Sequence, residues 1–169
     1  EEVVKFLDKN NQLGRKQVPI SINASILHAH NEHTADHYLK ILNKYHVDPS
    51  LVEIELTETD TISAYDNVKK MFHSLTEENI STALDDFGAG YSSFATLNIM
   101  HFDTLKIDKS LIDYIGNYGG DRLLEHTIAL AKDLGMYVTA EGVENETQVA
   151  FLQKLNCDSI QGYYYSKPL

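Results

Sequence analysis

Apolar positions along this chain follow two spacings, one typical of buried strands and one typical of amphipathic helices. Short apolar and β-branched runs predict six strands, at residues 18–23, 51–59, 80–85, 103–107, 136–140 and 157–160. Apolar residues three and four positions apart predict helices at residues 3–13, 34–45, 63–79 and 120–134, and a last helix capped by Asn145 and Gln148. Because strands and helices alternate, the pattern predicts an α/β fold with a parallel sheet.

Each predicted strand ends in a polar or charged residue, which is unusual for an otherwise buried segment. These residues are Asn23, Glu55, Asp85 with Asp86, Lys106, Glu141 and Gln161. In a parallel barrel of eight strands, the active site lies at the carboxyl ends of the strands. Six strands are counted here, whereas barrels of this kind typically have about 250 residues. We therefore expect an incomplete barrel in which two strands are absent.

The residue types at these strand ends indicate a site for hard cations. The carboxylates are Glu55, Asp85, Asp86, Glu141 and, less directly, Asp108, and no histidine stands among them. Oxygen ligands suit Mg²⁺ or Mn²⁺ better than Zn²⁺ or Cu²⁺. Two such ions can bind a phosphate ester and activate water for its hydrolysis. Lys106 would then orient the nucleophile or neutralise charge that develops on the phosphate.

The composition of the chain limits which partners it can bind and indicates the cellular compartment in which it works. The formal net charge of −11 argues against binding to DNA and against contact with an anionic membrane. The single cysteine, Cys157, cannot form an internal disulfide, which is typical of a reducing compartment. No apolar run approaches the roughly 18 residues of a membrane span, and the first ten residues do not resemble a signal peptide. The sequence therefore predicts a cytoplasmic location.

Several motifs resemble the EAL family of bacterial cyclic di-GMP phosphodiesterases, in order and with matching gaps from residue 1 to residue 169. They are ELTET (55–59), DDFGAGYSS (85–93), DTLKIDKS (103–110), AEGVEN (140–145) and CDSIQGYYYSKPL (157–169). The resemblance implies a TIM-type (β/α)8 barrel, of which this chain holds about six strands, the family's strands three to eight. It also implies hydrolysis of cyclic di-GMP to the linear dinucleotide pGpG with two Mg²⁺ or Mn²⁺ ions.

The resemblance also implies roles for individual residues. Asn23 and Glu55 look like ligands of the first metal, Asp85 like the aspartate that bridges both metals, and Asp86 like a ligand of the second. Glu141 resembles a glutamate assigned as metal ligand or general base. The other implied positions are Lys106 at the catalytic water, Gln161 near the metal-bound water, Glu58 holding the loop 86–93, and Asp108 and Tyr163 as candidate substrate contacts.

One departure from the family pattern limits what is expected of this chain. The Glu-Ala-Leu signature on the family's first strand is absent, together with the second strand. We therefore expect the carboxyl-terminal three-quarters of an EAL domain over residues 1–169, with absent or very weak hydrolysis by this chain alone. The parent protein is expected to carry GGDEF or sensory domains. A homodimer or other self-association is expected, because the loop 86–93 lies near the family's usual dimer contact and the missing strands leave open sheet edges.

Other readings of these residues stay open at this point. The alternative function is a non-catalytic module that binds cyclic di-GMP or a protein partner. Four histidines, His28, His30, His33 and His37, form either a metal site or a solvated helix face. Tyr163, Tyr164 and Tyr165 could stack on a guanine base, but strand alternation places at least one of them on the outside, and core packing is the alternative for the others. Glu53 is either part of the site or a structural carboxylate.

Overall fold

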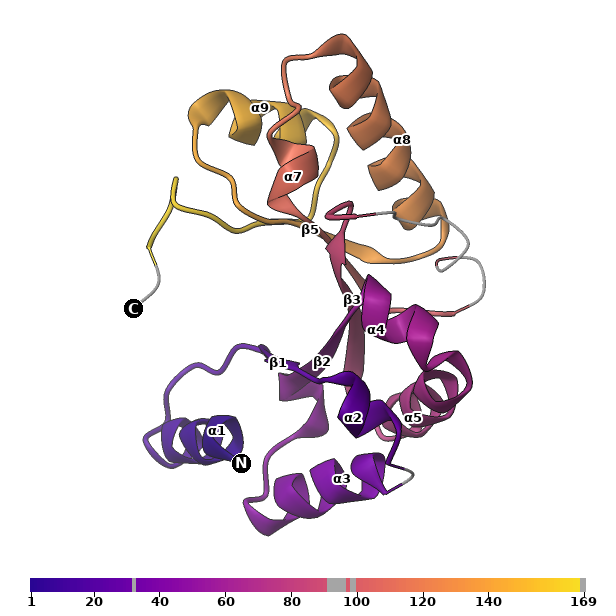
Figure 1. Ribbon diagram of the computed structural model, residues 1–169. Coiled ribbons are helices and arrows are strands. Elements are labelled where there is room, and N and C mark those ends of the chain that lie inside the picture. The colour runs from indigo at the N-terminus through magenta and orange to yellow at the C-terminus, as the bar shows by residue number, and fades with distance from the viewer. Residues whose placement is uncertain (32, 91–96, 98–99, 168–169) are drawn as a thin grey trace. The chain divides into compact units, whose positions relative to one another are not determined.

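The computed structural model describes residues 1–31, 33–90, 97 and 100–167, and it has an α/β fold (Figure 1). The chain divides into two compact units, residues 1–82 and 83–169. Each unit contains parallel strands connected by helices, as the alternating pattern of the sequence predicts. Within the described residues, no helix combines the length and the hydropathy that a membrane span requires.

The first unit holds two parallel strands and the helices that connect them. Its elements are α1 (Glu2–Gln12), β1 (Ile20–Asn23), α2 (Ile26–Ala29), α3 (Thr34–Lys44), the 3-10 helix η1 (Pro49–Leu51), β2 (Val52–Thr57), α4 (Glu58–Ser63) and α5 (Tyr65–Glu77). β1 pairs with β2, so that Ile22 lies opposite Ile54 and Asn23 lies opposite Glu55. The register therefore brings the ends of the two strands, with their polar residues, side by side.

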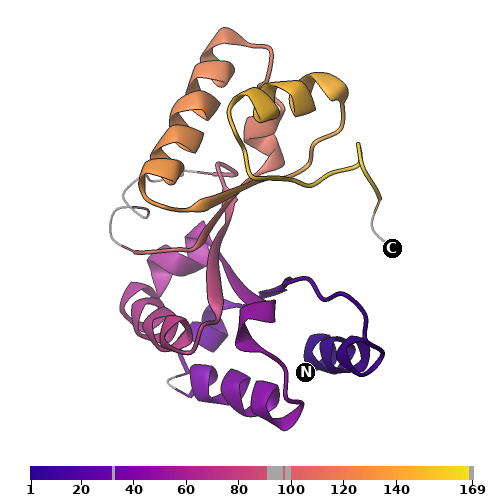
Figure 2. The same cartoon turned by 180° about the vertical axis from the view of Figure 1, so that it is seen from behind.

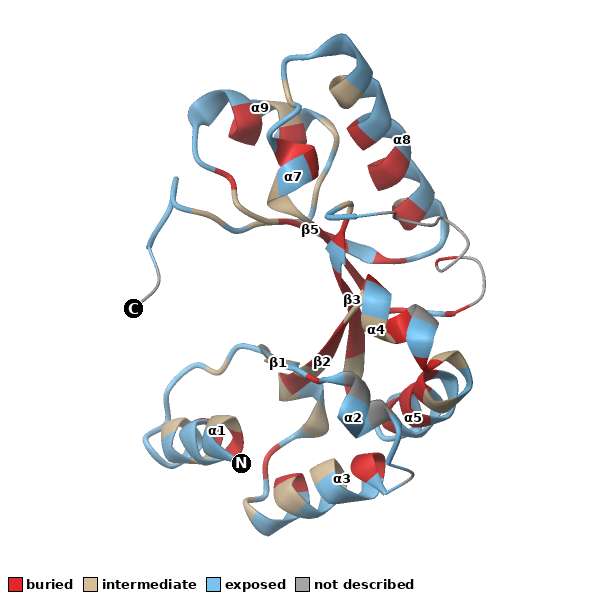
Figure 3. Cartoon of the chain, viewed as in Figure 1, coloured by how far each residue is buried: buried red, intermediate tan, exposed pale blue. Residues whose placement is uncertain are grey.

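Aliphatic and aromatic side chains of α5 supply much of the buried core of the first unit (Figure 3). The four residues predicted to face inward are all buried, namely Val68, Met71, Phe72 and Leu75. On α3 only Leu42 of the predicted inner positions is buried, whereas Tyr38, Leu39 and Ile41 are half-buried. The face of α3 that carries these three residues is therefore incompletely packed.

Two predicted boundaries in the first unit are wrong. The strand predicted to reach residue 59 ends at Thr57, whose Oγ1 accepts a hydrogen bond from the Asp60 backbone N–H at 3.3 Å and caps α4. The helix predicted over 63–79 is α5, Tyr65–Glu77, and a separate short helix that was not predicted, α4, precedes it and ends next to Ala64. The physical reason is local, because hydroxyl side chains that bond nearby backbone groups compete with continued strand pairing and favour a helix start.

The second unit contains parallel strands whose described pairs follow chain order. Its elements are β3 (Ser81–Phe87, of which the first two residues belong to the first unit), β4 (Thr104–Ile107), α7 (Lys109–Ile112), α8 (Tyr118–Asp133), β5 (Tyr137–Ala140), α9 (Glu146–Lys154) and β6 (Ser159–Ile160). β3 pairs with β4, β4 with β5, and β5 with β6, all in parallel. Every residue of β4 is buried, and Figure 2 shows α8 and α9 beside these strands from behind.

The capping box predicted for the last helix is confirmed. The Asn145 side-chain oxygen accepts from the Gln148 backbone N–H at 3.0 Å, and the Gln148 side-chain oxygen accepts from the Asn145 N–H at 3.2 Å. Gly135, predicted to end the preceding helix, lies just beyond α8 with a φ of +81°. That left-handed backbone favours glycine and stops the helix.

Other predictions in the second unit need correction. α8 begins at Tyr118 instead of Gly120, and Leu134, predicted to face inward, is 39% exposed because it lies beyond the helix end. The last strand is only Ser159–Ile160, shorter than the predicted 157–160. The short helix α7 was not predicted. The helix-compatible stretch that the sequence suggests after Gly90 falls mostly outside the described residues, as do residues 91–93 of the loop 86–93.

Candidate active site

A buried ion-pair network connects three consecutive strand ends of the second unit. The Lys106 Nζ lies 3.1 Å from Asp85 Oδ1 and 2.8 Å from Glu141 Oε1. Lys106 comes from β4, Asp85 from β3, and Glu141 directly follows β5, where its backbone N–H donates to the Ile107 carbonyl at 2.9 Å. Lys106 and Asp85 are both buried. The sequence predicted that these residues lie near one another, and the structure confirms it.

An irregularity in β3 separates the two neighbouring aspartates. The register of β3 against β4 shifts between Leu84 and Phe87, and Asp86 has a φ of +56° in the left-handed region. The Asp86 backbone N–H donates to Asp85 Oδ1 at 2.9 Å. A β-bulge of this kind redirects a side chain at a strand end. Here Asp85 stays in the buried ion-pair network, while Asp86 is exposed.

Negative charge concentrates around Asp86. Partial burial, then the charge of Asp85, then that of Asp108 raise the pKa of the Asp86 carboxyl, while Lys106 opposes them. A carboxyl whose pKa is raised by neighbouring carboxylates is stabilised in its charged form when a cation is present. The electrostatics of this strand end therefore favour an added positive charge.

The segments that follow β3 and β4 are held together by one backbone and one side-chain hydrogen bond, both to backbone carbonyls. The Asp108 N–H donates to the Phe87 carbonyl at 3.0 Å, and Ser110 Oγ donates to the Gly88 carbonyl at 3.0 Å. Asp108 also caps α7, since its Oδ1 accepts from the Ser110 N–H at 2.9 Å. Asp108 thus has a structural role in addition to the substrate contact that the sequence suggested, and that contact stays a prediction.

Lys109 is a residue that the sequence analysis overlooked. Its Nζ pairs with Asp113 at 2.7 Å and with Glu144 at 3.2 Å, so it connects α7 to the loop after β5. Gly142 in that loop has a φ of +67°, and a Cβ there would lie 2.5 Å from the Cβ of Lys109. The quoted motif DTLKIDKS contains Lys109, but nothing in the spacing of the motif indicates its distant partner.

The last strand leads into an exposed aromatic segment. The Gln161 N–H donates to the Ala140 carbonyl at 2.8 Å, which places Gln161 next to the end of β5. Gly162 approaches Val143 so closely that a Cβ would lie 2.1 Å from its carbonyl oxygen. The tyrosines that follow are exposed, namely Tyr163, Tyr164 and Tyr165, and the last two rings meet edge to face at 5.0 Å. Core packing of these three side chains is therefore wrong, and stacking on a ligand stays a prediction.

The first unit places a second set of predicted residues at the ends of β1 and β2. Asn23 and Glu55 are register partners, Glu55 is buried, and the Ala24 N–H donates to the Glu55 carbonyl at 2.8 Å. Glu58 is buried in the first turn of α4. Glu53 Oε1 accepts from Ser21 Oγ across the strand pair at 2.8 Å, which is consistent with the structural alternative for this carboxylate.

Histidine does not contribute a metal site to the part of the chain that the structure describes. Among those residues, no group of three or more His, Cys, Asp or Glu side chains is arranged to hold a metal ion. His28 Nδ1 accepts from the Ser25 N–H at 3.0 Å, and His30 Nδ1 lies 3.0 Å from the Asn67 side-chain nitrogen. His33 and His37 are exposed, which agrees with a solvated helix face.

Comparison with known proteins agrees with this geometry. Residues 1–168 match the EAL domain profile. The chain is similar to the signaling protein YkoW of Bacillus subtilis (strain 168), with 41% identity over 76% of this chain and 16% of that protein. It is also similar to the cyclic di-GMP phosphodiesterase NbdA of Pseudomonas aeruginosa (strain PAO1), with 32% identity over 92% of this chain and 20% of that protein. The chain thus spans about a fifth of the length of these curated relatives.

A solved structure supports the same assignment of the fold. The manganese and cyclic di-GMP complex of Klebsiella pneumoniae BlrP1 at pH 9.0 matches with a TM-score of 0.87 and 28% identity, over 98% of this chain and 43% of that chain. The α/β fold class predicted from the sequence is therefore confirmed, and the solved structure that it matches is a complex with manganese and cyclic di-GMP.

Proposed function

Because this chain belongs to the EAL domain family, we propose that it forms part of a metal-dependent phosphodiesterase that hydrolyses cyclic di-GMP to linear pGpG. The observation that carries the proposal is the Lys106 ammonium held between Asp85 and Glu141 at three successive strand ends. A buried charged network of this kind costs desolvation energy that packing alone does not require. Relatives such as NbdA, named as a cyclic di-GMP phosphodiesterase, support the substrate.

The residue types at the strand ends of the second unit suit Mg²⁺ or Mn²⁺, although the described side chains are not arranged around an ion. Asp85 and Asp86 offer carboxylate oxygens, and partial burial together with the charges of Asp85 and Asp108 raises the pKa of the Asp86 carboxyl. We propose that these two residues hold the metals, together with Asn23, Glu55 and Glu141. Bound there, divalent cations would neutralise phosphate charge and lower the pKa of a coordinated water.

The side chains of the second unit have distinct proposed roles in hydrolysis. Lys106 Nζ holds the carboxylates of Asp85 and Glu141 in position and donates toward the attacking water. Glu141, whose Oε1 lies 2.8 Å from Lys106 Nζ, would act either as a metal ligand or as the base that accepts the proton of that water, the two roles that the family resemblance implies. Gln161 orients the same water from the end of the neighbouring strand.

The remaining assignments rest on the family resemblance. Glu58 would hold the loop 86–93 in its active shape. Asp108 and Tyr163 would contact the dinucleotide, and the exposure of Tyr163 leaves its ring available to a base. We further propose that residues 1–169 are the carboxyl-terminal three-quarters of an EAL domain. The parent protein would carry GGDEF or sensory domains and would self-associate, while this chain alone would hydrolyse the substrate weakly at most.

The test measures Mn²⁺-dependent conversion of cyclic di-GMP to pGpG by chromatography, on this chain and on a longer domain that includes the strands upstream. We expect weak or no turnover from the chain alone and Mn²⁺-dependent turnover from the longer domain. Absence of turnover in the longer domain would overturn the proposal. Binding of cyclic di-GMP without any turnover would instead support the non-catalytic module.

A matched pair of variants tests the metal assignment on this chain directly. We expect Asp85→Asn to weaken Mn²⁺ binding, measured by calorimetry, by about tenfold or more, because it removes one ligand charge. Asp133→Asn, the same substitution at an exposed position of α8, should leave Mn²⁺ binding unchanged. Asp86→Asn provides a second test that leaves the Lys106 ion pair intact. Equal binding by all four proteins would contradict the assignment.

A further inference from the structure

A cavity of about 370 Å³ lies within the first unit, on the side of the β1–β2 pair that faces α1 and α3. One wall is aliphatic and is formed by Val4, Ile22, Ile41, Leu42, Val52 and Ile54. Small-molecule sites are concave, mostly apolar and roughly 300–1,000 Å³ in volume. The cavity falls within that range and is about two and a half times the size of an engineered cavity of roughly 150 Å³ that binds benzene.

The opposite wall of the cavity is polar and comes from the segment that contains α2 and α3. Three of its side chains already make hydrogen bonds within the protein. Thr34 Oγ1 donates to the His28 carbonyl at 2.7 Å, His28 Nδ1 accepts from Ser25, and Asn31 Oδ1 accepts from the His33 N–H at 3.0 Å. These hydrogen bonds hold the polar wall in a defined shape.

Two other polar side chains of this wall have hydrogen-bonding capacity left. Among the described residues, neither the Tyr38 hydroxyl nor the His37 imidazole has a hydrogen-bond partner, although both line the cavity. Burial raises the pKa of the Tyr38 hydroxyl, so the group is a protonated donor at neutral pH. Tyr38 is only half-buried and His37 is exposed, so water can reach both groups and a bound ligand could take the place of that water.

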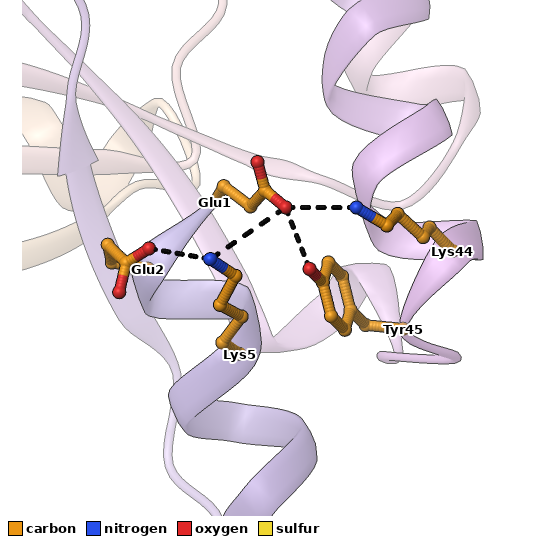
Figure 4. A network of polar contacts seen from close by, with 5 residues as sticks. All are labelled: Glu1, Glu2, Lys5, Lys44 and Tyr45. Atoms are coloured by element: carbon orange, nitrogen blue, oxygen red, sulfur yellow. Dashed lines mark hydrogen bonds and ion pairs between the residues drawn. The ribbon is translucent and has the colours of Figure 1, made fainter.

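The charges at the cavity favour a neutral occupant. Its one carboxylate, Glu1, is engaged, with Oε1 lying 2.7 Å from the Tyr45 hydroxyl and 3.1 Å from Lys44 Nζ (Figure 4). The described residues that line the cavity include no lysine or arginine, so an anion would find no lysine or arginine charge among them. The net charge of −11 of the whole chain also disfavours anions.

We propose that this cavity binds a small neutral molecule with an apolar ring system and one hydrogen-bonding oxygen. The ring system contacts Ile22 and Ile54, and the oxygen faces Tyr38 and His37. The volume suits one or two fused rings. Because side chains alternate along a strand, the bound molecule lies on the face of β1 and β2 opposite to Asn23 and Glu55.

The position of the cavity suggests an effector site, and this step rests on the proposed function. A ligand that packs against Ile22 and Ile54 would favour one arrangement of the strand pair that carries Asn23 and Glu55. The binding step itself requires neither metal nor cyclic di-GMP. Ligand binding is therefore measured in the absence of metal and of cyclic di-GMP. Failure to bind the ligand and failure to hydrolyse cyclic di-GMP are then separate results.

The experiment titrates the metal-free, ¹⁵N-labelled chain with 2-naphthol and follows the backbone amide signals by NMR. We expect saturable shifts concentrated in β1, β2 and α3. Ile41→Trp places a large side chain at the half-buried rim of the cavity and should weaken binding by about tenfold or more. Lys40→Trp, on the exposed face of the same helix, should bind like the unaltered chain.

Tyr38→Phe keeps the aromatic ring and removes only the hydroxyl. Loss of one hydrogen bond should weaken binding by about three- to tenfold. This variant also keeps the test decisive if Ile41→Trp fails to fold. The proposal is overturned if no saturable shift occurs, if Ile41→Trp binds equally well, or if the same amides shift with protein concentration alone, which would mean that a second copy of the chain occupies the cavity.

Discussion

At the scale of single residues, Lys106 shows how charge is accommodated inside the second unit. Its ammonium is buried, and the carboxylates of Asp85 and Glu141 lie within 3.1 Å of it and balance its charge. A buried ion pair does not by itself stabilise a fold strongly, because desolvation offsets the attraction. Removal of one partner is costly, since the remaining charges are left in a medium of low dielectric constant.

Lys106→Met should therefore destabilise the chain. It leaves Asp85 and Glu141 without their shared cation, and we expect a loss of about 3–5 kcal/mol in the free energy of unfolding. Lys40→Met, at an exposed position, should change it by less than about 0.5 kcal/mol. Urea denaturation of both variants measures the difference. Similar midpoints for the two variants would show that the Lys106 network contributes nothing to stability.

At the scale of the elements, helix caps separate two asparagines that look alike in the sequence. Asn145 caps α9 through its side chain and completes a capping box. Asn117 precedes α8 in the same position, but its side chain makes no capping hydrogen bond. The two residues therefore form a matched pair for measuring the contribution of the cap.

Asn145→Ala should cost about 0.5–2 kcal/mol of stability, because one backbone N–H of the first turn of α9 loses its acceptor. Asn117→Ala has no such bond to lose, and its effect should be markedly smaller. Thermal unfolding of the two variants, followed by circular dichroism, distinguishes them. If both substitutions shift the melting temperature equally, the side-chain cap of α9 is not the stabilising feature.

The contact between α1 and α3 gives stability a dependence on pH. The hydrogen bond from Tyr45, then Lys44 and Lys5, lower the pKa of Glu1 from 4.5 to about 2 (Figure 4). Because the pKa is lower in the folded state, the stabilisation is fully present above pH 4.5 and is lost as the pH falls toward 2. The residue is exposed, so salt should weaken the effect.

The melting temperature should therefore fall less steeply for Glu1→Ala than for the unaltered chain as the pH is lowered through this window. Tyr45→Phe removes the largest cause of the shift and should move the acid loss of stability to higher pH. The measurement is a series of thermal melts at low ionic strength. Parallel curves for all three proteins would contradict the role of Glu1.

At the scale of the whole molecule, strand edges predict self-association. Among the described pairs, β1 is bonded only to β2 and β6 only to β5, so each has one edge without a described partner. Exposed edges pair readily with other chains. We expect sedimentation velocity to show association that increases with protein concentration. A single monomeric species at high concentration, with a sharp and high melting transition, would contradict this expectation.

The sequence by itself determined the α/β class, the order of the elements, the capping box at Asn145 and the inward face of α5. These features depend on side-chain periodicity and on hydrogen bonds between residues that are close in the sequence. A short segment of the chain is therefore enough to predict each of them. The sequence also placed Asp85, Lys106 and Glu141 at successive strand ends, because parallel strands bring their carboxyl ends to one edge. Motif resemblance added the family, which the EAL domain match confirms.

Only the tertiary structure decided the details of the site and the boundaries of several elements. The bulge that separates Asp85 from Asp86 depends on how β3 pairs with β4, and the partners of Lys106 depend on packing between distant segments. The half-packed face of α3 leaves a cavity that no periodicity indicates. The physical reason is the same in each case, because burial and ion pairing arise from contacts between residues far apart in the chain.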